Sequence, residues 1–99
     1  MLSISSEIAP HYLEELMRLA AQLEVQVRIE RLGDEENPVE SGLAWVDGKA
    51  ILFIDSRLPD IQKVEVAARE LSVFPLEGMY IKPAIRKLLE KVAGSWTWT

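Results

Sequence analysis

Residues 50–74, AILFIDSRLPDIQKVEVAARELSVF, decide the fold of this chain. They open with an apolar run, AILFI, which lacks polar alternation and therefore predicts a strand covered on both faces and central in its sheet. After a turn that contains Pro59, apolar residues recur at three-and-four spacing, which predicts an amphipathic helix over residues 60–74. The apolar stripe widens onto the flank of the helix, so we expect this helix to contact more than one neighbour.

A β-hairpin leads into the central strand. Asp47-Gly48 lies between the apolar runs 42–46 and 50–54, and this pair favours a two-residue turn because both central residues need positive φ. Residues 24–31 alternate between apolar and polar side chains, which is the pattern of a strand with one buried face. A polar loop joins this strand to the hairpin.

Two further helices complete the predicted element order α-β-β-β-α-α. The first covers residues 7–23, with Met17 on its apolar face, and the last begins at Pro83 and stops near Gly94. We predict a single α+β domain over residues 1–99, with a three-stranded antiparallel sheet and the helices packed on it.

Composition narrows the classes of function. The 99 residues include 11 basic and 16 acidic side chains, a net charge of −5, whereas a nucleic-acid binder requires a basic face. The basic residues of the last helix, Lys82, Arg86, Lys87 and Lys91, are interpreted as its solvated side. The longest apolar run, AILFI, is far shorter than the roughly twenty residues of a membrane span, and the N-terminus lacks the features of a signal peptide. We therefore expect a cytoplasmic protein without nucleic-acid or membrane partners.

Residues able to carry catalysis are few and scattered. The chain has no cysteine, and its single histidine, His11, has no convergent partners, so we predict no catalytic set, no metal site and no cofactor. Asp47 is expected to serve the hairpin turn, while Asp55 and Asp60 are expected to cap the turn into the helix that follows.

The aromatic tail, residues 94–99, is the least usual segment. Trp96 and Trp98 alternate with threonines in a β-like pattern, and exposed tryptophan at a chain end is unfavourable. We expect these rings to fold back on the domain or to dock in a neighbouring subunit. Trp96 and Trp98 are therefore candidate interface residues.

The segment 42–74 resembles the core of the ImmA/IrrE-type zinc metallopeptidases. In that family a hairpin leads through a short turn, often with Leu-Pro, into a helix that bears His-Glu-x-x-His. Here the hairpin is GLAWVDGKAILFID, the turn is SRLPD and the helix is IQKVEVAARELSVF. The resemblance implies that the two ligand histidines fall at Arg69 and Val73, with Glu70 in the place of the general base. Arginine and valine cannot ligate zinc in this way, so the resemblance implies a catalytically dead relative.

A second resemblance spans residues 42–92. The hairpin with Gly48-Lys49 at its turn, the EVAAREL helix and the segment LEGMYIKPAIRKLLEK are similar to a group of short bacterial proteins without an assigned activity. This resemblance implies a fold and no particular role.

Three functions stay open from the sequence. The acidic charge, the lack of a catalytic set and the wide apolar surface favour a non-enzymatic protein-interaction domain, with a protein partner or a second copy in a homodimer. Alternatively, a pocket between the helix 60–74 and the connector after it would bind a small molecule or an anion, or act on it. The polar residues of that pocket would be Arg69, Glu70, Tyr80 and Lys82. The third function is that of a catalytically dead metallopeptidase-like domain.

Overall fold

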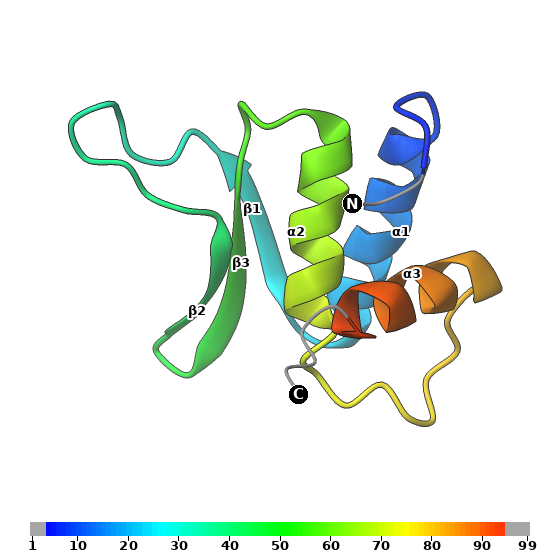
Figure 1. Cartoon of the computed structure of the whole chain (residues 1–99). Coiled ribbons are helices and arrows are strands. Elements are labelled where there is room, and N and C mark those ends of the chain that lie inside the picture. Colours follow the sequence, from blue (N-terminus) through cyan, green and yellow to red (C-terminus); the bar gives the residue numbers. More distant parts are fainter. Residues whose placement is uncertain (1–3, 95–99) are drawn as a thin grey trace.

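The structure is a computed structural model, and it describes residues 4–94 (Figure 1). Its elements follow the predicted order α-β-β-β-α-α. They are α1 (Ala9–Gln22), β1 (Gln26–Glu30), β2 (Gly42–Val46), β3 (Lys49–Asp55), α2 (Asp60–Leu71) and α3 (Pro83–Gly94). The tail residues Trp96 and Trp98 lie outside the described residues.

The three strands form one mixed sheet in the order β1-β3-β2. β3 is central, as predicted, and it pairs antiparallel with β2 but parallel with β1. The predicted antiparallel sheet is therefore wrong for the pair β1–β3. The reason is the long loop between β1 and β2, which leaves space for one strand between them. The hairpin after β2 then places β3 in that space (Figure 1). A third strand inserted between two oppositely directed strands runs parallel to the first.

The β2–β3 hairpin turns at Asp47 and Gly48, as predicted. Asp47 has φ 51° and Gly48 has φ 78°, so both central residues occupy the left-handed region that a type I′ turn requires. Val46 pairs with Lys49 across the turn, and the register continues regularly along both strands. The turn thereby fixes which backbone groups of β2 face β3.

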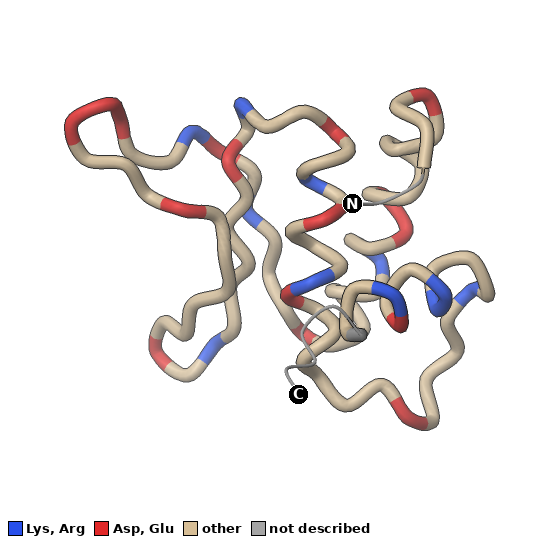
Figure 2. Tube along the Cα trace, viewed as in Figure 1, with Lys and Arg blue, Asp and Glu red and all other residues tan. Residues whose placement is uncertain are grey.

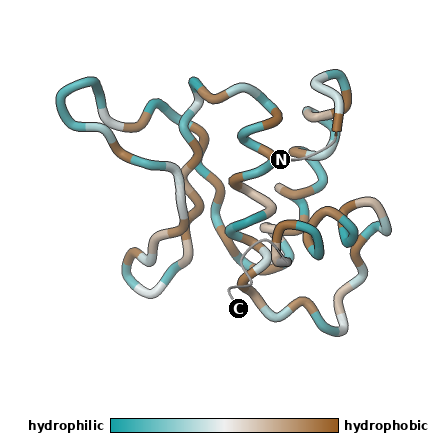
Figure 3. The backbone as a smooth tube through the Cα atoms, in the orientation of Figure 1, coloured by the Kyte–Doolittle hydropathy of each residue, from teal (hydrophilic) through white to brown (hydrophobic). Residues whose placement is uncertain are grey.

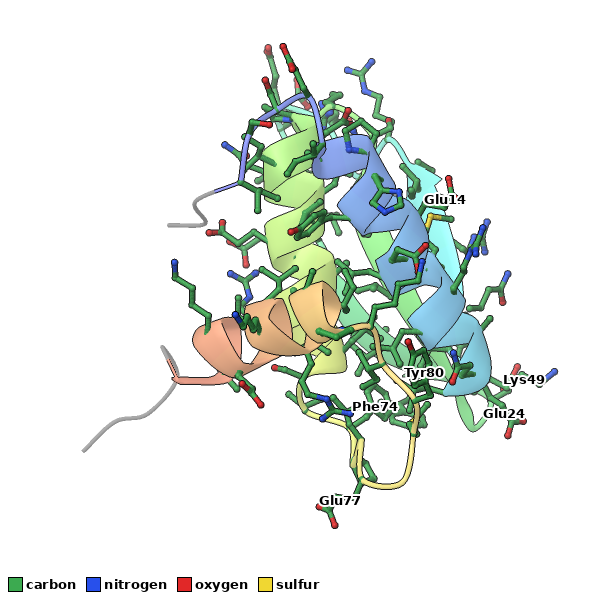
Figure 4. The ribbon with its side chains drawn as sticks, turned by 90° about the vertical axis from the view of Figure 1, so that its right-hand side faces the viewer. Glu14, Glu24, Lys49, Phe74, Glu77 and Tyr80 are labelled. Carbon is green, nitrogen blue, oxygen red and sulfur yellow. The ribbon has the colours of Figure 1, made fainter. Side chains whose placement is uncertain are left out.

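Helices α1 and α2 lie side by side over one face of the sheet, and α3 crosses them on the side away from the strands (Figures 1 and 4). The buried side chains of the sheet and the helices form one core. Figure 3 shows hydrophobic segments along β3 and the facing helices, and a hydrophilic loop before β2. The largest fully buried side chains are Leu16, Leu52, Ile54, Val64 and Leu71.

Three details of the helices differ from the prediction. Met17 is 40% exposed, because the buried stripe of α1 runs through Leu16 instead. Asp60 lies in the first turn of α2 and does not cap it, since Pro59 holds the N-cap position and no side chain bonds to this helix end. α2 also ends at Leu71, earlier than predicted.

None of the helices between residues 4 and 94 has the length and apolar character needed to cross a membrane.

Candidate functional site

The free edge of β2 is the candidate site. β2 lies at the border of the sheet, next to β3. Because Val46 and Lys49 flank a two-residue turn, they form a hydrogen-bonded pair, and such pairs alternate along an antiparallel ladder. This alternation directs the N–H and C=O groups of Leu43 and Trp45 away from β3, toward the open side of the strand.

This edge is apolar and uncharged. Its sequence GLAWV has no ionisable side chain, and Figure 2 shows β2 as an uncharged stretch between the acidic loop and the hairpin turn. Trp45 is 65% exposed, and the centroid of its ring lies 6.4 Å from that of Phe74, which follows α2. Val46 is exposed as well. An apolar strand edge of this kind is a template for pairing with another strand.

Glu70 reaches this edge from α2. Its Oε1 accepts the Leu43 N–H at 2.8 Å, and its side chain is 21% exposed. The same oxygen lies 3.5 Å from the point that a Cβ on Gly42 would occupy. Arg69 Nε lies 3.9 Å from the other carboxylate oxygen. Of the outward amides of β2, that of Leu43 is therefore bound to α2, while that of Trp45 faces the open side.

A second polar cluster holds the end of β3. The Arg57 guanidinium donates to Asp55 twice, from Nε to Oδ1 at 3.0 Å and from Nη2 to Oδ2 at 2.7 Å, and Nη2 also donates to the Leu32 carbonyl at 2.7 Å. The hydrogen bonds from Arg57 lower the pKa of Asp55 to about 2. On the other side, the Asp55 N–H donates to Ser41 Oγ at 2.8 Å. Asp55 Oδ1 also accepts the Arg57 N–H, which confirms Asp55 as a turn residue.

The structure divides the four predicted ligand-binding residues between separate places. Arg69 lines a shallow depression of about 300 Å³ beside Asp55. Tyr80 and Lys82 line another depression, of about 200 Å³, between α1 and the start of α3. Figure 4 shows Tyr80 beside the C-terminal part of α1. Glu70 is engaged with the backbone of β2, so the four side chains do not converge on one ligand.

Glu15 is a polar residue of the second depression that the sequence pattern does not reveal. Its side chain is only 9% exposed, and its Oε2 lies 3.1 Å from Lys82 Nζ and 3.9 Å from Arg18 Nη1. The hydrogen bond from Lys82 lowers the pKa of Glu15. No local pattern signals this pair, because Lys82 follows 67 positions later. The paired charges suit a contact between α1 and α3 better than an anion site.

Between residues 4 and 94, His, Cys, Asp and Glu side chains form no group of three or more that could hold a metal ion. His11 is exposed on α1. Val73, at a position that the metallopeptidase resemblance gives to a ligand, is 66% exposed. The apolar edge of β2 is therefore the strongest candidate site.

Trp45 is the residue of this site that sequence reasoning does not single out. A tryptophan in an apolar strand is usually expected to be largely buried. The available signal is a combination: the strand is uncharged, an Asp-Gly hairpin follows it, and a long loop precedes it. Together these features are compatible with an edge strand.

Comparisons with protein-family models, with curated proteins and with solved structures each find no match for this chain.

Proposed function

We propose that this protein is a non-enzymatic protein-interaction domain that self-associates, by pairing β2 antiparallel with β2 of a second copy. The observation that carries the proposal is Trp45, which is 65% exposed on an uncharged strand edge. Pairing of this kind adds a strand to an open sheet through main-chain hydrogen bonds, and side chains give the contact its specificity. It would join two three-stranded sheets into one continuous sheet.

A second copy is the occupant that suits this edge best. Two antiparallel strands of identical sequence can be related by a twofold axis, so that each copy contributes the same surface. At Trp45 the edge offers both a donor and an acceptor, which an identical strand can match. Each chain has a net charge of −5, which opposes contact in general, and β2 is an uncharged stretch through which two copies can approach.

The contact is small, which sets the expected strength of association. A tryptophan side chain contributes roughly 150–250 Å² of burial. Two such rings and the adjoining strands therefore lie at the low end of interface size. We expect an equilibrium between monomer and dimer that depends on concentration, not a permanent dimer.

Analytical ultracentrifugation over a wide range of protein concentration tests the proposal. The average mass is expected to rise with concentration for the natural sequence and to stay monomeric for Trp45→Lys, because a charge would have to be buried in the contact. Tyr80→Lys is the matched control, since Tyr80 is an aromatic residue with 78% exposure that lies between α1 and α3. A natural sequence that stays monomeric throughout, or a Trp45→Lys variant that still dimerises, would contradict the proposal.

A further inference from the structure

We propose that Glu70 sets the register of this strand pairing, by withholding the Leu43 amide and so placing the twofold axis at Trp45. The inference rests on the proposed self-association through β2 and specifies which residues of the two strands lie opposite each other. It assigns Glu70 a positioning role in the assembly, in place of a role toward a ligand.

Two registers are available to a twofold antiparallel pair of β2 strands. If the axis passes at Ala44, Leu43 lies opposite Trp45 of the partner subunit, and two hydrogen-bonded pairs form between the copies. If the axis passes at Trp45, each Trp45 lies opposite the partner's Trp45, and this single pair exchanges both of its hydrogen bonds. The first register requires the Leu43 N–H, and the second register can form without it.

Glu70 makes the Leu43 N–H unavailable. Its Oε1 accepts this N–H at 2.8 Å, and a hydrogen bond to a charged acceptor is stronger than one between neutral groups. A carboxylate can only accept, so it cannot offer the incoming strand a donor in exchange. The carbonyl of an incoming strand would also meet the negative oxygen at the start of β2, which lies 3.5 Å from the Cβ position of Gly42. These effects disfavour the Ala44-centred register.

The Trp45-centred register needs no hydrogen bond from the Leu43 N–H, because the residue opposite Leu43 is then the partner's Asp47, which lies in the hairpin turn. It places the two Trp45 side chains directly opposite each other on the same face of the joined sheet, where cross-strand aromatic pairs are favourable. Phe74 already lies beside this ring within each copy, 6.4 Å away between centroids. The register therefore gathers the exposed aromatic surface at the twofold axis.

Cysteine cross-linking distinguishes the two registers, because the chain has no cysteine of its own. In the Ala44-centred register, Ala44 lies opposite itself in a pair without hydrogen bonds, with Cα atoms about 4.5 Å apart, which is within the range of a disulfide. In the Trp45-centred register, Ala44 lies opposite the partner's Val46. With Glu70 present, we expect a disulfide between A44C and V46C chains in a mixture, and little between A44C chains alone.

Replacing Glu70 tests its role directly. In the E70A background the Leu43 amide is released, and we expect the A44C homodimer to increase about tenfold relative to the mixed disulfide. E70Q is the control, since its amide oxygen still accepts the Leu43 N–H and the pattern should stay as with glutamate. Circular dichroism and thermal unfolding establish that each variant is folded.

The outcomes separate this inference from the proposed function. An A44C homodimer already dominant with Glu70 present, or an E70A pattern unchanged while the protein still dimerises, overturns the role of Glu70 and leaves self-association standing. Absence of any concentration-dependent dimer, in the natural sequence and in E70A, overturns the proposed function itself and the register with it.

Discussion

The two edges of the sheet, β1 and β2, are five residues long each and border the same central strand, yet they differ in how they discourage pairing. β1 carries its own charges: Arg28 Nε lies 3.1 Å from Glu30 Oε2, and the Arg28 guanidinium lies over the Phe53 ring at 5.8 Å. β2 has no charged side chain, and Glu70 of α2 binds its edge. Charge within a strand discourages pairing wherever the strand is exposed. Glu70, in contrast, can bind the edge of β2 only while α2 and β2 stay packed together.

The largest effect is expected from the strand that both edges share. Leu52 is 0% exposed in the centre of β3, and Leu52→Ala should lower the free energy of unfolding by about 2–5 kcal/mol, as measured by denaturant titration. Val46→Ala, at a residue of β2 that is 46% exposed, is the control and should cost no more than about 0.5 kcal/mol. A similar cost in both variants would show that the edge of β2 is not open.

The next largest effect is expected in the loop between β1 and β2. Gly33 has φ 59°, and an added Cβ would collide with the Asn37 carbonyl oxygen. For Gly33→Ala the left-handed backbone alone costs roughly 1–2 kcal/mol, and the close approach forces the loop to move. We expect a lower melting temperature by calorimetry and faster amide hydrogen exchange in β2 than in β1.

Gly48→Asn is the control for this substitution. Gly48 has φ 78° in the hairpin turn with nothing within 4 Å of its Cβ position, and asparagine tolerates this backbone conformation. An equal loss of stability in both variants would mean that the close approach to the Asn37 carbonyl does not add to the cost of Gly33→Ala.

Acid should distinguish the two edges by a smaller amount. Because Arg57 lowers the pKa of Asp55 from 3.8 to about 2, the stability from this carboxylate is complete above its ordinary pKa and is lost as the pH falls toward 2. Arg57 also binds Leu32, just after β1, whereas the bond to Ser41 near β2 uses a backbone N–H that does not titrate. Amide exchange is therefore expected to increase first in β1. Asp55→Asn should show a flatter dependence of unfolding free energy on pH, and parallel profiles would refute this assignment.

The smallest effect on stability is expected at β1 itself. Changing Arg28 and Glu30 together to threonine removes an exposed ion pair, which is worth at most about 1 kcal/mol. Without these charges β1 resembles β2, so masses above the dimer should appear in ultracentrifugation at high concentration. The more exposed pair Glu14–Arg18 on α1, changed to glutamine at both positions, is the control and should leave the mass unchanged. If the threonine variant also keeps its mass, charge is not what protects β1.

Local signals predict most elements of this fold. The Asp47-Gly48 turn, the unbroken apolar run of β3 and the periodicity of α2 each depend on neighbouring residues. The structure contains all three, with α2 ending at Leu71, earlier than predicted. The pairing of β1 with β3, and not with β2, is not a local property. It depends on where the polar loop delivers β2 relative to β1.

The candidate site shows the same limit. Glu70 stands out in the sequence, but its partner is the backbone of Leu43, 27 positions away, and a main-chain amide leaves no mark in a sequence pattern. Arg69 and Lys82 belong to different depressions because the connector after α2 leads the chain across to α1. The exposure of Trp45 follows from the place of β2 at the border of the sheet, which is itself a consequence of topology.

The order of strands in space also sets an order in time. Gln26 of β1 pairs with Ile51 of β3, so β1 leaves the ribosome well before the strand that completes its hydrogen bonds. The β2–β3 hairpin is local, and such hairpins close within about 1–10 μs. Pairing of β1 with β3 is then the slow step, because closing the loop between them costs conformational entropy. Translation that pauses before β3 would leave β1 and β2 without the strand that joins them, which makes synthesis, and not the mature fold, the period of greatest risk for misassembly.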